Sequence, residues 1–154
     1  MLNVTARQEL MRTIVDTLGV VVEEARLDFG KDGLSVRVVD PSHVAMIKME
    51  VDSAAFETWE IDETQLGLEM RKLTGILGQG GAGDMVELAY NDESGQATIK
   101  IGRIDLNLRP LDNTTLNPPN VPSLELPCGV TIAGSELAKA LRATKLVGDL
   151  VNLS

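Results

Sequence analysis

Three residues with the chemistry of a hydrolase site lie within four positions of one another. Asp40, Ser42 and His43 supply the acid, the hydroxyl and the imidazole of a Ser-His-Asp triad. In a triad these groups line up in space, whereas side chains packed into one tight turn diverge. Pro41 follows the aspartate and is typical of a turn that ends a strand. The pattern therefore favours a turn that His43 helps to hold, or one in which His43 and Val44 form the wall of a surface pocket.

Two other groups of residues invite comparison with binding sites. The glycine-rich stretch 75–83 lacks the Gly-Lys-Ser/Thr ending of a phosphate loop and follows an expected helix instead of opening one, which favours a flexible helix exit. Five carboxylates on alternating surfaces have no His or Cys partners and indicate a solvated acidic face, not a metal site: Asp52, Glu57, Glu60, Asp62 and Glu63. We therefore expect no catalytic residue, no metal and no cofactor, and a protein that is not an enzyme.

The turn at Asp40 joins two stretches with the alternation of half-buried strands, residues 34–39 and 47–51. Together they predict an antiparallel pair. The segments around it read as a strand over 2–5, a helix over 6–18, a strand over 20–29 and a short extended piece over 55–61. This order of elements is β, α, β, β, β.

The same order begins again at Thr64. It comprises a strand over 65–69, a helix over 71–79, and strands over 85–90, 97–101 and 103–109. A linker over 110–127 holds five of the six prolines and should run extended across a surface.

A third copy of the unit begins after the linker. A strand over 129–132 precedes a helix that Ser135 would cap and that runs to about Val147, and a further strand starts at Asp149. The predicted organisation is a first domain over 1–109, made of units 1–63 and 64–109, the linker, and an incomplete second domain over 128–154.

The charge of the chain gives two opposed indications. A formal net charge of -9, from 14 cationic and 23 acidic residues, argues against a nucleic-acid binder, whose footprint is a basic face. Yet each predicted helix turns a cation away from its apolar side, as Arg12, Arg71, Lys139 and Arg142 do. Such a cation is commonplace on a single helix. Its repetition on three helices is compatible with a polyanion-binding surface.

The cysteine content and the hydropathy indicate an intracellular location. Cys128 is the only cysteine, which excludes an internal disulfide and a multi-cysteine zinc site and fits a reducing compartment. The first ten residues lack the apolar core of a signal peptide, and no apolar run is long enough to span a membrane. We expect a cytoplasmic protein with no membrane partner.

Residues 38–47, Val-Val-Asp-Pro-Ser-His-Val-Ala-Met-Ile, resemble the first domain of the DNA sliding clamps of archaea and eukaryotes, the proliferating cell nuclear antigen family. The runs 54–59, 72–77 and 120–127 fall in the order of that family, and the proline-rich linker is similar to the archaeal type. The resemblance implies an α+β DNA clamp fold of repeated βαβββ units, with antiparallel sheets outside and helices lining a central channel. It implies a nucleoid-associated processivity factor of DNA replication and repair.

The resemblance also implies roles for particular residues. The channel residues, which would contact the phosphates of double-stranded DNA without reading its bases, are Arg12, Arg71, Lys72, Lys139, Arg142 and Lys145. The pocket for PIP-box peptides of DNA polymerase, clamp loader, flap endonuclease and DNA ligase would comprise Val39, His43, Val44, Met46, Leu116, Pro119 and Val121. The edge that pairs with the next subunit of a homotrimer would comprise Arg103, Ile104, Leu106, Leu108 and Arg109.

The number of units departs from the family pattern. Family members carry four units per chain, whereas this chain carries two and the start of a third, so we expect a fragment. Two alternatives stay open at this point: a checkpoint-type clamp subunit, and a small β-rich ligand-binding domain or enzyme that uses the turn around His43.

Overall fold

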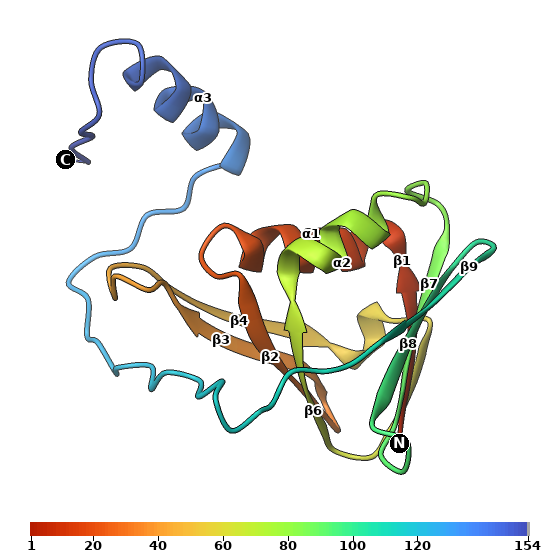
Figure 1. Ribbon diagram of the computed structural model, residues 1–154. Coiled ribbons are helices and arrows are strands. Elements are labelled where there is room, and N and C mark those ends of the chain that lie inside the picture. Colours follow the sequence, from red (N-terminus) through yellow and green to blue (C-terminus); the bar gives the residue numbers. More distant parts are fainter. Residues whose placement is uncertain (154) are drawn as a thin grey trace. The chain divides into compact units, whose positions relative to one another are not determined.

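The computed structural model describes residues 1–153, and the chain forms two units, Met1–Val121 and Pro122–Ser154. The first unit contains two α-helices, the short 3-10 helix η1 (Ser53–Ala55) and nine strands (Figure 1). Its α-helices are α1 (Gln8–Gly19) and α2 (Met70–Leu77). Its strands are β1 (Leu2–Arg7), β2 (Glu24–Gly30), β3 (Gly33–Val39), β4 (Met46–Asp52), β5 (Thr58–Ile61), β6 (Thr64–Glu69), β7 (Met85–Asn91), β8 (Gln96–Ile101) and β9 (Ile104–Leu108). In the first unit the predicted order of elements is confirmed, and the extended piece predicted over 55–61 contains the strand β5.

The strands form two antiparallel sheets, and the first strand of each repeat lies in the sheet of the other repeat. One sheet has the order β5-β1-β7-β8-β9 and the other the order β4-β3-β2-β6. Strand β1, from the first repeat, pairs with β7 of the second, while β6, which opens the second repeat, pairs with β2 of the first. Each repeat therefore completes the sheet of the other, so the two form one interleaved domain.

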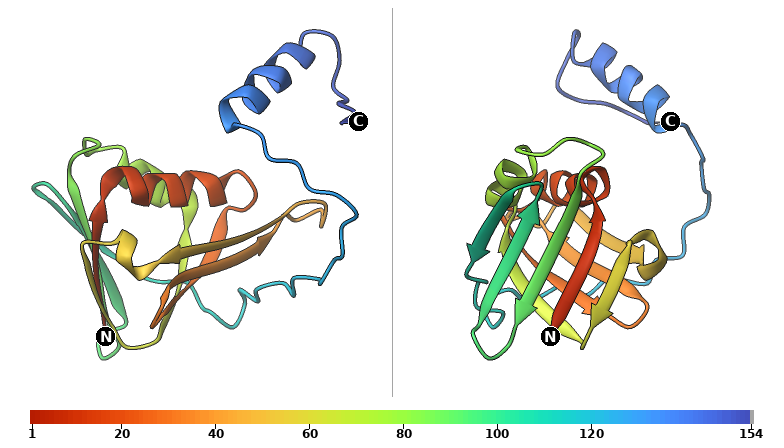
Figure 2. Two further views of the ribbon diagram at one scale, coloured as in Figure 1. Left: turned by 180° about the vertical axis from the view of Figure 1, so that it is seen from behind. Right: turned by 90° about the vertical axis from the view of Figure 1, so that its right-hand side faces the viewer.

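The core is largely aliphatic, because only 3% of the residues are aromatic, and Phe29 and Phe56 are its buried aromatic side chains. Alternate residues of the strands point inward and are buried, among them Val4, Val36 and Leu88. The apolar sides of the helices cover this core, and Figure 1 shows α1 and α2 side by side at one end of the sheets, while the right-hand view of Figure 2 shows the five-stranded sheet in front. Buried Gln8 donates from Nε2 to the Leu77 carbonyl at 2.8 Å, which ties the start of α1 to the end of α2.

The second unit contains the helix α3 (Gly134–Thr144). Two strands predicted here were wrong, because residues 129–132 and 149–153 form no strand. A strand requires a hydrogen-bonding neighbour, and the described residues provide none for these segments. Ser135 is not the N-cap either, since Ala133 occupies that position and α3 ends three residues before Val147.

Two boundaries in the first unit also differ from the prediction. Residues 20–23 precede β2 instead of forming its start, because the amides of Val21 and Val22 both donate to the Leu18 carbonyl at 3.0 Å and close the end of α1. The helix α2 ends at Leu77, two residues earlier than predicted. No helix among residues 1–153 is long and apolar enough to cross a membrane.

Candidate functional site

The Asp40 turn, residues 40–45, connects β3 to β4 and is organised by one carboxylate. Asp40 Oδ1 accepts the amides of Val44 and Ala45, both at 2.7 Å, and Oδ2 accepts the amide and the hydroxyl of Ser42. These donors, led by the Ala45 amide, lower the pKa of Asp40 from 3.8 to about 2. Because both oxygens serve the turn, Asp40 does not take the place of the orienting acid of a triad.

His43 occupies an unusual position at the tip of this turn. Its φ of 57° lies in the left-handed region, which few residues other than glycine adopt. The side chain is exposed, and neighbouring Val44 is 86% exposed. The turn therefore presents His43 and Val44 to the surface, as the pocket-wall interpretation requires.

A cleft lies beside this turn on the outer face of the four-stranded sheet. The linker cleft, with a volume of about 160 Å³, is lined by residues of β2 and β3, by Val22, which precedes β2, and by residues 115–119. Of the seven predicted pocket residues, the structure brings Val39, Leu116 and Pro119 into its lining. His43, Val44, Met46 and Val121 lie outside that lining, and the last three are at least 40% exposed.

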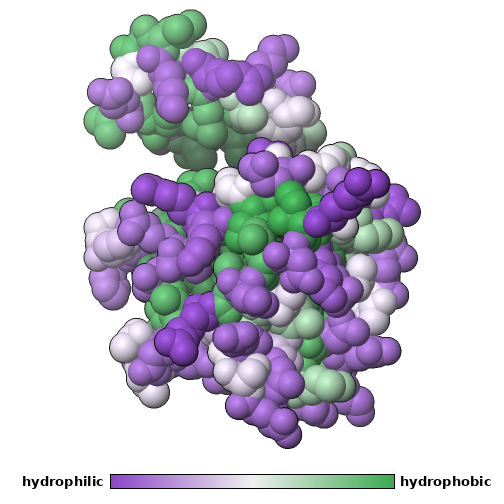
Figure 3. All heavy atoms as spheres, turned by 45° about the vertical axis from the view of Figure 1, so that its right-hand side comes forward, coloured by the Kyte–Doolittle hydropathy of each residue, from purple (hydrophilic) through white to green (hydrophobic). Residues whose placement is uncertain are grey.

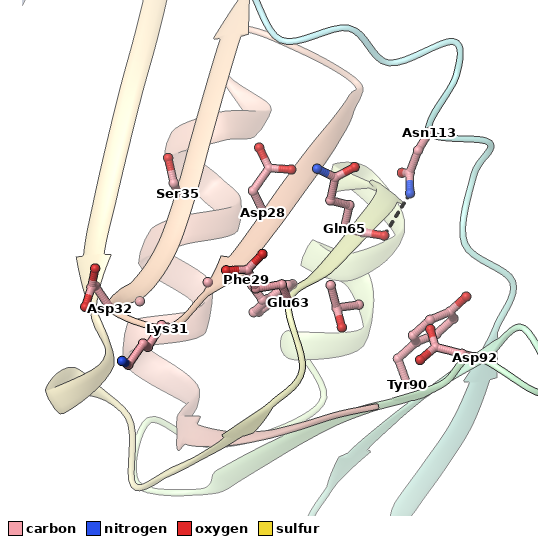
Figure 4. Close-up of a pocket in the computed structure, with 13 residues that line it drawn as sticks. Asp28, Phe29, Lys31, Asp32, Ser35, Glu63, Gln65, Tyr90, Asp92 and Asn113 are labelled. Carbon is pink, nitrogen blue, oxygen red and sulfur yellow. Dashed lines mark hydrogen bonds between the residues drawn. The ribbon is translucent and has the colours of Figure 1, made fainter.

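The start of the linker is anchored on β6. The Leu111 amide donates to the Gly67 carbonyl at 2.8 Å, and Asn113 Nδ2 donates to the Gln65 carbonyl at 2.8 Å, a bond drawn in Figure 4. A Cβ on Gly67 would lie 2.7 Å from Cδ1 of Leu116 and 3.1 Å from Cβ of Leu111. Glycine at this position lets the linker lie directly on the sheet and hold Leu116 in the cleft wall.

Several residues of the linker cleft were missed from the sequence. They are Val22, Glu24, Ala25, Arg26, Arg37, Val38, Thr115, Asn117 and Pro118. The polar members on β2 and β3 read as ordinary solvent-facing positions of half-buried strands. A signal was present in Gly67, since a glycine inside a strand often marks a close approach of another backbone.

The predicted channel residues lie on exposed helix surfaces. In the first unit, Arg12 Nε is 3.2 Å from Asp16 Oδ2 on α1, and Arg71 of α2 is 4.0 Å from Glu23. Lys72 is also exposed and lines a small hollow with Arg109. In the second unit, Lys139 and Arg142 are exposed on α3, and exposed Lys145 directly follows it.

The predicted subunit edge is the outer strand of the five-stranded sheet. Within the part of the chain that the structure describes, β9 pairs with β8 and leaves its other side unpaired. Leu106 is 38% exposed, whereas Leu108 is buried against the core. Arg103 and Arg109 flank the strand and are exposed. The edge therefore offers free backbone groups and one exposed leucine.

A larger hollow than the linker cleft is acidic and lies elsewhere on the first unit. It has a volume of about 750 Å³, and its lining includes Asp28, Asp32, Glu63 and Asp92 together with Lys31 (Figure 4). Among the described residues, no group of three or more His, Cys, Asp and Glu side chains could hold a metal ion. Figure 3 shows one face of the molecule, on which apolar residues gather in limited areas among hydrophilic ones.

Comparisons of sequence and of structure with known proteins all identify members of one family. The family model for the N-terminal domain of proliferating cell nuclear antigen matches residues 1–106. The DNA polymerase sliding clamp of Methanosarcina mazei is 34% identical over 150 residues, which cover 97% of this chain and 61% of the relative. That of Methanosphaerula palustris is 34% identical over 154 residues, covering 99% of this chain and 62% of the relative.

A solved structure shares the fold. A. fulgidus PCNA, bound to the C-terminal region of FEN-1, superposes with a TM-score of 0.92 at 31% identity, over 97% of this chain and 61% of that chain. The chain thus spans about three fifths of the length of the relatives it matches. The resemblance of residues 38–47 is confirmed, together with the DNA clamp fold. Because the family model covers 106 of its 154 residues, the chain belongs to the proliferating cell nuclear antigen family.

Proposed function

We propose that the chain is part of a DNA polymerase sliding clamp, a processivity factor that encircles duplex DNA and tethers replication and repair proteins to it. The observation that carries the proposal is the structural match to A. fulgidus PCNA over 97% of the chain. The relatives named DNA polymerase sliding clamp support it further. The replicative role is preferred over a checkpoint-type subunit because of these names, and over a ligand-binding enzyme because Asp40 is committed to its turn.

In this proposal the helices face the duplex. Arg12, Arg71 and Lys72, and with them Lys139, Arg142 and Lys145 of the second unit, contact phosphate groups without reading bases. Sliding needs such contacts to be weak and exchangeable, so enclosure and not affinity keeps the protein on DNA. Of the 23 acidic residues, only Glu9, Asp16 and Glu136 lie on these three helices, so most of the negative charge stays away from the duplex. The unpaired side of β9 joins the next subunit of a homotrimer.

The linker cleft and the adjoining Asp40 turn are proposed to receive PIP-box peptides. The cleft contributes Val39, Leu116 and Pro119, and the turn contributes the exposed Val44. Burial of one aliphatic or aromatic anchor supplies about 2 kcal/mol, so several anchors together give micromolar affinity. Flap endonuclease is the partner with the most direct support, since A. fulgidus PCNA was solved with the C-terminal region of FEN-1. DNA polymerase, clamp loader and DNA ligase are proposed to use the same surface.

Topological retention tests the clamp proposal. The full-length clamp, loaded on duplex DNA, is expected to stay on a circular molecule and to run off a linear molecule of the same sequence. The reason is that an enclosed ring leaves only through a free end. Fluorescence of labelled clamp on immobilised DNA measures both rates, and blocking the ends of the linear DNA should restore retention. Equal loss from the circular and the unblocked linear form would refute the proposal.

Titration of Asp40 tests the role of the turn. A folded-state pKa of about 2, below the ordinary 3.8, means that the carboxylate stabilises the turn above pH 3.8 and loses this effect as the pH falls toward 2. NMR titration should show the amide protons of Val44 and Ala45 shifting with a midpoint near 2. In Asp40→Asn these shifts should disappear, and the FEN-1 C-terminal peptide should bind severalfold more weakly.

The conservative control for this titration is Ser42→Ala. It removes the hydroxyl donor but keeps the three amide donors, led by that of Ala45, so the pKa of Asp40 should rise only part of the way toward 3.8. A wild-type midpoint near 3.8 would show that the carboxylate does not organise the turn in solution.

A further inference from the structure

The exposed side of α1 and α2 carries a carboxylate between its cations. Asp16 Oδ2 lies 3.2 Å from Nε of Arg12, one turn earlier on α1. Its other oxygen, Oδ1, accepts a hydrogen bond of 3.2 Å from the hydroxyl of Thr74 on α2. One side chain thus engages the cation of the first helix and the surface of the second.

Position 16 is electrostatically unfavourable for this carboxylate. Asp16 lies in the last turn of α1, where the helix dipole places partial negative charge. The last turn of α1 contains no basic residue that would offset the repulsion locally. A neutral residue here would suit the helix better, and it would also leave Arg12 free for a phosphate. The carboxylate is therefore costly both for the helix and for attraction to DNA.

This surface has two ion pairs, Arg12–Asp16 and Arg71–Glu23, and the first of them is the better formed. Arg71 and Glu23 are 4.0 Å apart and their side chains are 92% and 88% exposed, so solvent screens their attraction. Arg12 and Asp16 are closer and only about half exposed, at 50% and 46%. Of the two cations with carboxylate partners, Arg12 is thus the one whose charge is more strongly compensated.

We propose that Asp16 sets the sliding mobility of the clamp by competing with DNA phosphates for Arg12. The inference rests on the proposed function, in which α1 and α2 face the duplex. When no phosphate is near, Arg12 pairs with Asp16, and each phosphate that arrives must displace this partner. Contacts with DNA therefore stay short-lived, and the ring moves on.

The variant that tests this role is Asp16→Asn in the full-length clamp. Asparagine keeps the size of the side chain and an oxygen that accepts from Thr74, and removes the charge alone. One charge acting across water at about 7 Å changes an interaction about threefold. At low salt we expect run-off from linear duplex to slow about threefold or more, with retention on circular DNA unchanged. Raising the salt concentration should erase the difference.

Two controls separate this role from a general charge effect or a structural effect. Glu93→Gln changes the net charge equally but lies in the exposed turn between β7 and β8, away from α1, and should leave run-off unchanged. Asp16→Glu retains the charge and should restore run-off to near the wild-type rate. In an Arg12→Ala background, the Asp16→Asn change should slow run-off much less, because the competing cation is gone.

The outcomes distinguish this inference from the clamp proposal itself. Equal loss of wild-type protein from circular and linear DNA refutes the clamp proposal. If the wild type distinguishes the two forms and Asp16→Asn runs off at the wild-type rate, the inference about Asp16 is overturned alone. It is likewise overturned if Glu93→Gln slows run-off as much as Asp16→Asn does.

Discussion

Replacing Gly33 with alanine is expected to lower the free energy of unfolding by on the order of 3–4 kcal/mol. Gly33 begins β3 with a φ of 149°, and a Cβ there would lie 2.1 Å from the Val51 carbonyl oxygen and 2.9 Å from the Ser53 amide nitrogen. Both are backbone atoms, so β4 would have to move away from β3. That movement would break the bond from the Ser53 amide to the Asp32 carbonyl and disturb the pairing of Gly33 with Asp52.

The matched control for this prediction lies in the same turn. Gly30 pairs with Gly33 across the turn, yet its nearest atom to an added Cβ is the Gly33 carbonyl oxygen at 3.8 Å, an ordinary contact. Gly30→Ala should therefore change the free energy of unfolding by no more than about 1 kcal/mol. Urea denaturation followed by circular dichroism measures both variants. Similar stabilities for the two would mean that β3 and β4 do not approach as closely in solution as in the structure.

Replacing Gly67 with alanine is expected to weaken binding of the FEN-1 C-terminal peptide about tenfold. An added Cβ meets Cδ1 of Leu116 at 2.7 Å and both Cβ and the carbonyl oxygen of Leu111 at 3.1 Å. The leucine tip can rotate away, but the Leu111 backbone must shift, so the linker lifts from β6. Losing the contact of about two methylene groups in the cleft wall corresponds to about tenfold in affinity. Fluorescence anisotropy with a labelled peptide gives the dissociation constant.

The control for Gly67 is a glycine with open space around it. Gly75 lies in α2, where an added Cβ meets no atom within 4 Å, so Gly75→Ala should leave peptide affinity unchanged and stabilise the helix by roughly 0.5–1 kcal/mol. The two variants should thus differ in binding, whatever their stabilities. Wild-type affinity in Gly67→Ala would show that Leu116 does not contribute to the peptide site.

The predictable part of the fold is the part that neighbouring residues encode. Alternation over 34–39 and 47–51, with Asp40 and Pro41 between them, suffices for a strand, a turn and a strand, because the Asp40 carboxylate binds amides only two to five residues away. The exchange of β1 and β6 between the sheets was not predicted, because a period of two identifies a strand but not its partner. The strands predicted wrongly at 129–132 and 149–153 have the same cause, since a sequence pattern does not show whether a pairing partner is present.

The candidate site also has residues that the sequence could place and residues that it could not. The turn residues His43 and Val44 could be placed on the surface from the sequence, because a tight turn exposes its tip. Arg26 and Arg37 could not be placed in the linker cleft, since their strand positions are polar whether water or the linker covers them. Which of these surfaces the linker covers depends on contacts such as that between Gly67 and Leu116, which join residues distant in the chain.

The interleaved sheets carry a consequence for biosynthesis. Strand β1 is among the first to leave the ribosome, yet its partner β7 begins at Met85, and Leu2 pairs with Tyr90. A nascent chain that stops before β6 leaves β2 with β3 as its single neighbour, and one that stops before β7 leaves β1 with β5 alone. Such distant pairings fold slowly, because the chain must close a long loop before it gains the contacts. Translation of the second repeat is therefore the event that commits the first repeat to its native structure.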